Sequence, residues 1–360
     1  MPKVKNICII ASSLGVGGAE KVAALQSEML QDLGYKVFIV SVLNHIEYPY
    51  AGTLLNLGLL KDKRDTFFDG IHRLFVLKRF LNNNDIDLII DHRSRNHNLR
   101  EFLLKFIVFR TKVIFMVHSM NLEKSFSENK LISRFLYKNA SCLVSVSKAI
   151  EEKSISVYGF SNVKTIYNAF KKEILLVPGN VAESDIYILF FGRLDEEAKD
   201  LSFLINAYHK SSLPLKGVQL ILLGSGPDSF KLHQLVLKLQ LIDSIIFVEH
   251  TNNPFPYVRN AKFTVLTSNF EGFPMSIIES LACETPVVAV DNISGPRELI
   301  RGNYNGLLVE KSLVTYAEAL DRMISDTELL ATCKKNSLES IQHLSYSNIK
   351  KEWGALIESL

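Results

Sequence analysis

Two glutamates, Glu271 and Glu279, stand eight residues apart around the junction of an apolar strand and a helix. Pro274 suits the first helical position, so we expect the helix to begin there. The N–H groups of Met275 and Ser276 would then lack partners within the helix. Glu279 would lie one turn after Met275, its side chain directed back toward the N-terminus. The two carboxylates could each bind a pair of vicinal hydroxyls, one on a sugar and one on a ribose; a solvated Glu279 is the alternative.

A second group of residues could bind phosphate. Arg193 follows an apolar strand and Gly192, and Lys199 comes six residues later at the start of an expected helix, 200–208. Cations at the end of a strand and at a helix N-terminus can together neutralise a diphosphate. Solvated surface cations are the alternative interpretation.

Three glycines, Gly15, Gly17 and Gly18, follow the first apolar strand and open the first helix. Such a loop presents backbone amides to a phosphate or a sugar, although a tight turn alone would also use glycine. The dinucleotide fingerprint is not met, because Glu20 stands where its third glycine belongs and the next strand is not followed by an acidic residue. NAD binding is therefore disfavoured.

Short apolar strands alternate with helical segments over most of the chain, which predicts an α/β fold of two doubly wound domains facing one another across a cleft. The expected strands are 7–11, 36–42, 88–91, 112–117, 142–146, 163–166, 186–191, 218–223, 245–248, 263–267, 286–290 and 307–309. The expected helices include 19–33, 66–81, 98–109 and 131–137. We expect a first domain at 1–170, a linker at 171–185, a second domain at 186–342, and a C-terminal helix at 343–360 that returns to the first domain.

Composition narrows the functional classes. The chain has 360 residues, 47% hydrophobic, with a net charge of +3, which excludes a disordered chain and argues against a nucleic-acid coat. Its four cysteines are far apart in sequence, as in reduced cytosolic proteins. Residues 3–14 imitate a signal peptide, but the pattern favours a buried strand running into a helix. We therefore expect a cytoplasmic protein.

The combination of Glu271 and Glu279 with Arg193, Lys199 and the early glycines resembles the retaining nucleotide-sugar glycosyltransferases of family four, which have the GT-B fold. The resemblance covers essentially the whole chain. Further agreement comes from Val117-His118, Val146-Ser147, Tyr167-Asn168-Ala169, Gly224-Ser225-Gly226-Pro227 and Thr285-Pro286-Val287. The segment 294–298 is similar to members that build bacterial surface polysaccharides such as lipopolysaccharide and capsule.

The resemblance implies a role for each residue. Arg193 and Lys199 would hold the donor diphosphate without a metal or other cofactor, and Glu279 would bind the ribose. The donor sugar would be held by Glu271 and by the residues that follow it, Gly272, Phe273, Met275 and Ser276. The loop of Gly15, Gly17 and Gly18 would close over phosphate and acceptor. His118 would lie beside the donor sugar, and His118 and Glu271 are the catalytic candidates.

The implied reaction moves a hexose or N-acetylhexosamine, with retention, from a UDP-linked sugar to a saccharide or lipid-linked saccharide. We expect front-face displacement, in which the leaving phosphate accepts the proton of the acceptor hydroxyl. Metal-dependent transferases of the other major fold use an Asp-x-Asp pair. Asp85 and Asp87 form one here, but they precede a strand and are expected to be surface charge at the wrong end of the sheet.

Two positions depart from the family pattern. Asp200 stands where the family usually has glycine, which places an anion beside Lys199; we expect it to cap the following helix and point away. Pro274 stands where many members have glycine, which removes one amide donor.

The charge is unevenly distributed. Residues 1–165 hold 23 Lys and Arg against 15 Asp and Glu, and the remainder holds 18 against 23. The basic excess concentrates in Arg93, Arg95, Arg100, Lys105, Arg110 and Lys112, among apolar residues. Such a segment could rest on an anionic membrane at the inner face of the cell, or it could be a core helix with a charged outer stripe.

Two other functional classes share these features. A GT-B-fold nucleotide-sugar epimerase should carry more acid–base side chains in the first domain than His118 alone. A non-catalytic nucleotide-sugar-binding protein would not need both glutamates and both cations.

Overall fold

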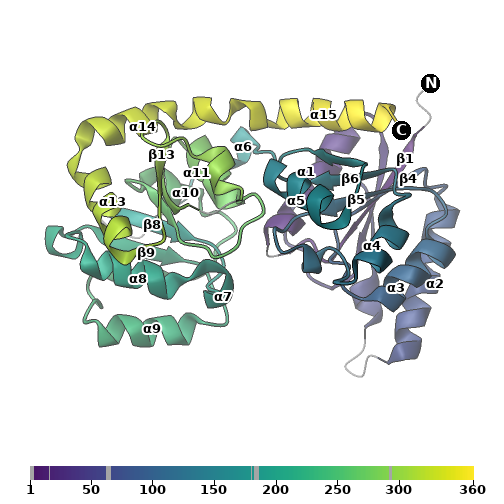
Figure 1. The fold of residues 1–360 in the computed structure, drawn as a ribbon, viewed down its shortest axis with the longest axis horizontal. Helices are drawn as coiled ribbons and strands as arrows, with labels where there is room; N and C mark the ends of the chain where they lie inside the picture. The colour runs from purple at the N-terminus through teal and green to yellow at the C-terminus, as the bar shows by residue number, and fades with distance from the viewer. Residues whose placement is uncertain (1–3, 16, 62–65, 180, 182–185, 292–293) are drawn as a thin grey trace. The chain divides into compact units, whose positions relative to one another are not determined.

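The computed structural model of the chain describes residues 4–15, 17–61, 66–179, 181, 186–291 and 294–360. The chain divides into unit 1, Met1–Asn168 with Tyr346–Leu360, and unit 2, Ala169–Ser345 (Figure 1). Each unit is a parallel sheet flanked by helices. Within the described residues, no helix is both long and apolar enough to cross a bilayer.

Unit 1 contains seven parallel strands in the order β3-β2-β1-β4-β5-β6-β7. They are β1 (Asn6–Ala11), β2 (Lys36–Ser41), β3 (Thr53–Asn56), β4 (Leu88–Asp91), β5 (Lys112–Val117), β6 (Cys142–Ser145) and β7 (Val163–Thr165). The central strands are runs of β-branched and other apolar residues whose side chains are fully buried in β1 and β4. Helices cover both faces of such a sheet, so both faces of each strand are apolar.

The helices of unit 1 are α1 (Gly18–Asp32), α2 (Phe67–Asn83), α3 (Asn98–Leu103), the π-helix η2 (Leu104–Val108), α4 (Lys130–Tyr137), α5 (Lys148–Tyr158) and α15 (Tyr346–Glu358). Two short 3₁₀ turns, η1 (Leu57–Leu60) and η3 (Leu122–Lys124), complete the unit. Thr66 and Asp69 form a reciprocal capping box at the start of α2, which fixes where that helix begins.

Unit 2 contains six parallel strands in the order β10-β9-β8-β11-β12-β13. They are β8 (Tyr187–Phe191), β9 (Gln219–Leu223), β10 (Ile245–Val248), β11 (Thr264–Leu266), β12 (Val287–Val290) and β13 (Gly306–Val309). Its helices are α6 (Lys172–Leu175), α7 (Glu196–Lys199), α8 (Leu201–Lys210), α9 (Ser229–Lys238), α10 (Phe255–Asn260), α11 (Met275–Ala282), α12 (Pro296–Leu299), α13 (Leu313–Ser325) and α14 (Thr327–Ser340), with 3₁₀ turns η4 (Pro214–Lys216) and η5 (Gln342–Leu344).

The strand order of each sheet reverses at one place. In unit 1 the reversal lies between β1 and β4, and in unit 2 it lies between β8 and β11. Loops that leave neighbouring strands on opposite sides of the sheet separate there and open a crevice at the carboxyl ends. The doubly wound architecture expected from the sequence is therefore confirmed, and it identifies two sheet edges at which ligands can bind.

The C-terminal helix α15 packs against α1 in unit 1, as expected. The Tyr346 hydroxyl donates to Asp32 Oδ2 at 3.0 Å, and Lys350 Nζ lies 3.4 Å from the same oxygen. Trp353 and Gly354 are buried, and Gly354 faces the Leu33 side chain. The chain thus begins and ends in the same unit.

Several elements differ from expectation. The edge strand β3 gave no clear signal, because its residues are only half-buried. The helix expected over 98–109 is divided into α3 and a π-helical turn. The segment 171–185, expected to be a linker, includes the short helix α6. The helix after Glu271 begins at Met275, one residue later than expected, with Pro274 as its N-cap.

Candidate active site

Lys199 and Glu271 form an ion pair at the reversal point of unit 2. Lys199 ends α7, which follows β8, and Glu271 lies in the loop after β11. Lys199 Nζ is 2.5 Å from Glu271 Oε1, with side-chain exposures of 22% and 11%. The sequence predicted a diphosphate ligand at one residue and a sugar ligand at the other, and the fold brings the two together at the carboxyl edge.

Backbone contacts hold these two loops in register. The Asn269 N–H donates to the Ala198 carbonyl at 2.9 Å, and its Nδ2 donates to the Glu197 carbonyl at 2.9 Å. The Thr267 hydroxyl donates to the Lys199 carbonyl at 2.9 Å. Because the main chain is anchored on both sides, the Lys199 and Glu271 side chains project from a fixed frame.

The N-terminus of α11 presents backbone donors. Its N-cap Pro274 makes no side-chain capping bond, and its carbonyl accepts from the Ile277 and Ile278 N–H groups. Among the described residues, the N–H groups of Met275 and Ser276 have no hydrogen-bond acceptor, as expected of a first helical turn. These amides and the positive end of the helix suit an anionic ligand.

The other predicted residues of this segment lie around α11. Glu279 is one turn after Met275 and is 6% exposed, so it is not a freely solvated carboxylate. Phe273 is buried, and Gly272 is partly exposed. A side chain at Gly295 would meet the Gly272 carbonyl oxygen at 2.8 Å, so the loop before α12 packs directly against this turn.

Arg193 is the most accessible of the predicted donor ligands. Its side chain is 62% exposed, and its Nε lies 3.7 Å from Asp195 Oδ2, a spacing that leaves the guanidinium available to another anion. The preceding Gly192 is packed against Gly224, whose φ is +144°. A Cβ at Gly224 would lie 1.9 Å from the Gly192 carbonyl oxygen, so the loops after β8 and β9 require glycine to meet.

Asp200 caps α8, as predicted, with Oδ1 accepting from the Phe203 N–H at 3.3 Å. Its backbone is left-handed, with φ +48° and ψ +54°. Glycine adopts this conformation without strain, which explains why the family that the sequence resembles usually has glycine at this position. Aspartate is one of the few other residues that tolerate it. Its second oxygen pairs with Lys311 at 2.5 Å, a partner that the sequence did not reveal.

The glycine loop lies at the start of α1 in unit 1, after β1. Gly17 is the N-cap, with φ +144°, and its N–H donates to the Tyr48 hydroxyl at 3.4 Å. Gly15 is buried against His45, and Gly18 opens the helix. Val16 lies outside the described residues. The glycines thus follow β1 and open α1 at the carboxyl edge of the first sheet, as the sequence predicted.

His118 directly follows β5 and is joined to a second histidine. His92 follows β4, and its Nδ1 lies 3.1 Å from His118 Nε2. The other His92 nitrogen, Nε2, lies 2.6 Å from Gln26 Oε1 on α1. Burial and the nearby Arg95 charge lower the pKa of His118 to about 3, and burial lowers the pKa of His92 well below its usual value. Both rings are therefore neutral near pH 7.

The sequence missed His92 and Gln26. A signal existed, because each histidine directly follows an apolar strand and the two strands are neighbours in the sheet. The predicted residues Gly15, Gly17, Gly18 and His118 belong to unit 1, and the remainder belong to unit 2.

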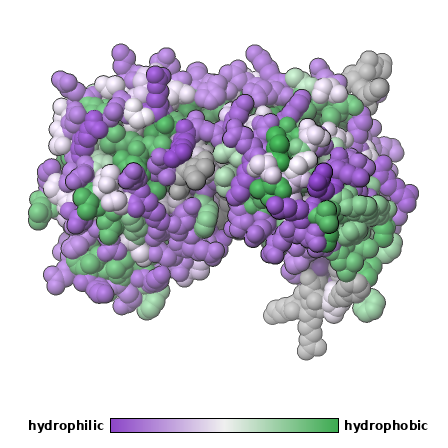
Figure 2. Space-filling model, viewed as in Figure 1, coloured by the Kyte–Doolittle hydropathy of each residue, from purple (hydrophilic) through white to green (hydrophobic). Residues whose placement is uncertain are grey.

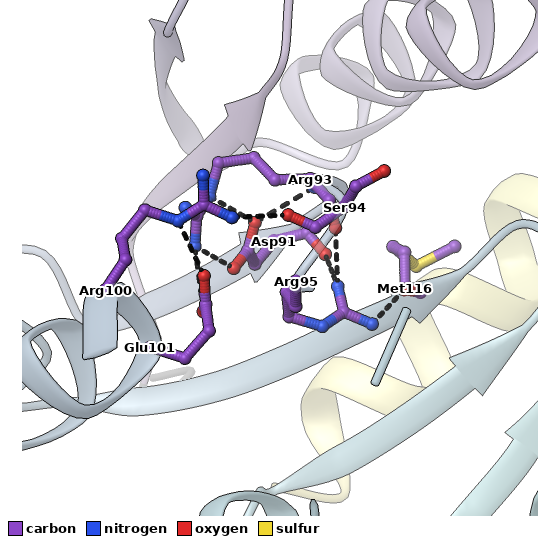
Figure 3. Close-up of polar contacts among 7 residues, drawn as sticks. All are labelled: Asp91, Arg93, Ser94, Arg95, Arg100, Glu101 and Met116. Atoms are coloured by element: carbon purple, nitrogen blue, oxygen red, sulfur yellow. Dashed lines mark hydrogen bonds and ion pairs between the residues drawn. The ribbon is translucent and has the colours of Figure 1, made fainter. Parts of the chain in front are cut away.

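Arg93 and Arg95 are buried and do not contribute to a basic surface, which was one of the two interpretations that the sequence allowed. Arg93 is 7% exposed and forms a bidentate contact with Asp91, at 2.9 and 2.7 Å, and lies 3.5 Å from Glu101 (Figure 3). Arg95 is fully buried, and its guanidinium donates to three backbone carbonyls, those of Asp91, Arg93 and Met116. Burial of these cations is offset by two carboxylates around Arg93 and by three carbonyl oxygens around Arg95.

A pocket of about 520 Å³ lies at the carboxyl edge of unit 1. Its apolar wall includes Ile10, Leu57, Leu74, Leu77, Leu103 and Leu104. Its basic lining comprises Lys61, Arg73, Arg93 and Arg100. The combination suits an amphiphile that carries an anionic group.

The Asp-x-Asp pair has a structural role at the opposite edge. Asp87 Oδ2 accepts from the N–H groups of Lys5 and Asn6, at 2.8 and 2.9 Å, at the amino end of β1. The pair therefore lies at the amino end of the sheet, as the sequence predicted.

Comparison with known proteins identifies the family of the chain. Residues 16–173 match the family described as Glycosyltransferase Family 4, and residues 171–340 match Glycosyl transferases group 1. An N-acetylgalactosamine-N,N'-diacetylbacillosaminyl-diphospho-undecaprenol 4-alpha-N-acetylgalactosaminyltransferase of Campylobacter jejuni is 28% identical, covering 93% of this chain and 94% of the relative. The lipopolysaccharide 1,6-galactosyltransferase of Salmonella typhimurium is 27% identical, covering 52% of this chain and 55% of the relative.

Two solved structures share the fold. Sucrose-phosphate synthase of Thermosynechococcus elongatus superposes with a TM-score of 0.82 at 21% identity, covering 99% of this chain and 98% of that one. The Anabaena protein HepE in complex with UDP-glucose superposes with a TM-score of 0.77 at 20% identity, covering 99% of this chain and 100% of that one. The chain therefore belongs to glycosyltransferase family four and has the GT-B fold.

Proposed function

We propose that this glycosyltransferase moves a hexose or N-acetylhexosamine from a UDP-linked sugar to a lipid-linked saccharide during cell-surface polysaccharide biosynthesis. The observation that carries the proposal is the Lys199–Glu271 pair at the reversal point of unit 2. Support for the substrates comes from the Campylobacter relative, whose name specifies a diphospho-undecaprenol-linked acceptor, and from the HepE complex with UDP-glucose.

The donor diphosphate would lie between Arg193, Lys199 and the first amides of α11. An ammonium group has three donors, so Lys199 can keep its contact with Glu271 and still bind a phosphate oxygen. Glu271 would accept hydrogen bonds from hydroxyls of the donor sugar, and the covered Glu279 would bind the ribose. This assignment uses every polar group that the sequence singled out in unit 2.

The same groups would stabilise the leaving diphosphate without a metal ion. Charge develops on the phosphate oxygen as the bond to the anomeric carbon breaks, and fixed cations and amides lower the energy of that charge because they need no reorganisation. The Lys199 side chain is held from a main chain anchored through Asn269 and Thr267. Metal independence follows from this preorganised charge.

The reaction would proceed on one face of the donor sugar, so that the anomeric configuration is retained. The bond from the anomeric carbon to the phosphate oxygen breaks, and its electron pair leaves with UDP. The acceptor oxygen forms the new bond, and its proton passes to the departing phosphate oxygen. Neutral His118 would accept a hydrogen bond from a hydroxyl of the donor sugar, since its lowered pKa excludes the charged form at neutral pH.

The acceptor would occupy the pocket of unit 1. Its apolar wall can cover the first units of a lipid chain, and Arg73 with Lys61 can contact a phosphate that links lipid to saccharide. A free saccharide has no lipid chain that could pack against this apolar wall. The pocket thus favours a lipid-linked acceptor over a free saccharide.

A membrane contact would bring this pocket to its substrate. Large apolar side chains are exposed on α2, α3, the π-helix and α4, and Figure 2 shows a hydrophobic patch over α2 and α3. They include Phe68, Phe75, Leu99, Phe106, Ile107 and Leu131. Exposed cations, among them Arg79, Arg110 and Lys130, accompany them. Apolar anchors surrounded by cations suit an anionic lipid surface.

The experiment is a transfer assay with the full chain, a panel of UDP-sugars and a polyprenyl-diphosphate-linked saccharide. Mass spectrometry identifies the product, and NMR of its anomeric proton reports the configuration. We expect one donor to be transferred with retention, and we expect Glu271→Gln to reduce transfer at least tenfold while Glu318→Gln, an exposed glutamate on α13, does not.

The other functional classes would give different products. Interconversion of donor sugars without transfer would indicate an epimerase. Binding of a UDP-sugar with neither transfer nor interconversion would indicate a non-catalytic protein. An inverted product would contradict the front-face mechanism.

A further inference from the structure

Asp200 introduces a negative charge directly beside Lys199, where the family usually has glycine. The left-handed backbone at this junction of α7 and α8 accounts for the glycine. An aspartate can adopt the conformation, but its carboxylate adds an anion next to a residue assigned to the donor diphosphate. Unless it is neutralised, that charge repels phosphate and competes for the Lys199 ammonium.

Lys311 meets the Asp200 carboxylate from another part of the chain. It lies between β13 and α13, and its Nζ is 2.5 Å from Asp200 Oδ2. The two side chains are 35% and 23% exposed. The Nζ also lies 5.7 Å from the centre of the Phe203 ring, on the first turn of α8. Lys311 is thus positioned by an anion and by an aromatic face.

The same ammonium reaches the loop that carries Glu271. Lys311 Nζ donates to Asn269 Oδ1, and Asn269 is the residue whose N–H and Nδ2 bind the carbonyls of Ala198 and Glu197. Lys311 therefore contacts both loops that hold the Lys199–Glu271 pair, without belonging to either.

We propose that Lys311 is a positioning residue for the donor diphosphate, which neutralises Asp200 and so leaves Lys199 available to phosphate. The proposal rests on the proposed role of Lys199 in donor binding. It predicts that Asp200 and Lys311 act together: loss of the Lys311 charge weakens donor binding only while the Asp200 carboxylate is present.

The test compares variants of the full chain in UDP binding by calorimetry and in the KM for the donor sugar. Lys311→Met removes the charge and keeps an unbranched side chain. We expect it to raise the dissociation constant for UDP and the donor KM about tenfold, with a smaller change in kcat. Lys311→Arg retains the charge and should remain within about twofold of the wild type.

The decisive variant is the double substitution Asp200→Asn with Lys311→Met. Asparagine keeps the helix cap and tolerates the left-handed backbone, so it removes the charge alone. We expect UDP binding by the double variant to return to within about threefold of the wild type. Asp200→Gly with Lys311→Met provides a second form of the same test. A purely structural role for Lys311 would not be rescued in either background.

The outcomes separate this inference from the proposed function. If the wild type binds UDP and Lys199→Ala weakens that binding, the donor site stands, and the Lys311 variants alone decide the inference. An unchanged Lys311→Met, or a double variant as impaired as Lys311→Met, overturns it. If the wild type binds no UDP, the donor site and the inference fail together.

Discussion

The Nδ1 atom of His92 lies 3.1 Å from Nε2 of His118, in a chain of contacts that begins at Gln26. With the Gln26 oxygen facing His92, the Nε2 of His92 donates and its Nδ1 accepts. His118 then donates from Nε2, and its Nδ1 remains an acceptor. The two rings and the amide thus fix both the neutral state and the tautomer of His118.

This pair predicts a characteristic pH dependence of stability. Both histidines have folded pKa values below the unfolded value of 6.5, so the unfolded chain binds more protons and stability falls as the pH drops below about 6.5. Replacing His92 with Asn removes one such group. We expect the thermal midpoint of His92→Asn to decline less steeply between pH 6.5 and pH 4.5 than that of the wild type. Parallel curves would show that His92 does not titrate in this way.

The contact of Gly224 with Gly192 predicts a large loss of stability. Alanine at Gly224 must adopt a positive φ and place its Cβ against the Gly192 carbonyl, so we expect Gly224→Ala to cost about 2–4 kcal/mol in urea unfolding. Gly217→Ala is the matched control. Its φ is +69° but the surrounding space is open, so it should cost only about 1 kcal/mol. Equal losses would contradict the packing argument.

Arg73 tests the acceptor pocket. It lines the pocket on α2, whereas Arg79 on the same helix is exposed and does not line it. We expect Arg73→Ala to raise the KM for a polyprenyl-diphosphate-linked acceptor about tenfold, because a charge-assisted contact is lost, and to leave the donor KM unchanged. Arg79→Ala should change neither constant. A rise in the donor KM alone would exclude this assignment of the pocket.

The apolar face of α2 predicts binding to anionic vesicles. Phe68 and Phe75 are seven residues apart on one face and are 78% and 59% exposed. We expect the double substitution to Glu to weaken vesicle co-sedimentation at least about tenfold. Leu215→Glu, at a side chain that is 93% exposed in unit 2, should not weaken it. Binding that is insensitive to both salt and the Phe substitutions would refute the membrane contact.

The strands that the sequence predicted best are continuous apolar runs. The expected bounds of β4 and β5 agree with the structure, and so do those of β10, an edge strand whose residues are apolar although three of the four are only half-buried. The edge strand β3 carries no such run. Its pairing with β2 depends on tertiary context.

The candidate site was predicted unevenly for a similar reason. Motifs that lie within one short stretch of sequence, such as Glu271 in its loop and Glu279 on the helix that follows, can be recognised from their spacing. Lys311 could not be found in that way, because it comes from a loop 111 residues after Asp200 and its relevance depends on a contact. Arg93 and Arg95 were misleading for the opposite reason. A count of charges includes them, but it does not reveal that they are buried and bonded to a carboxylate and to carbonyl oxygens.

The assignment of Lys199 to the donor site is tested by the rate of sugar transfer by Lys199→Ala, measured with a UDP-sugar and a lipid-linked acceptor beside the control Lys210→Ala. Lys210 is an exposed lysine at the end of α8. We predict that Lys199→Ala weakens donor binding at least about tenfold and reduces transfer further, because the leaving diphosphate loses a partly buried cation. Lys210→Ala should match the wild type. Full transfer activity in Lys199→Ala, with unchanged donor KM, would contradict the assignment of this ion pair to the donor site.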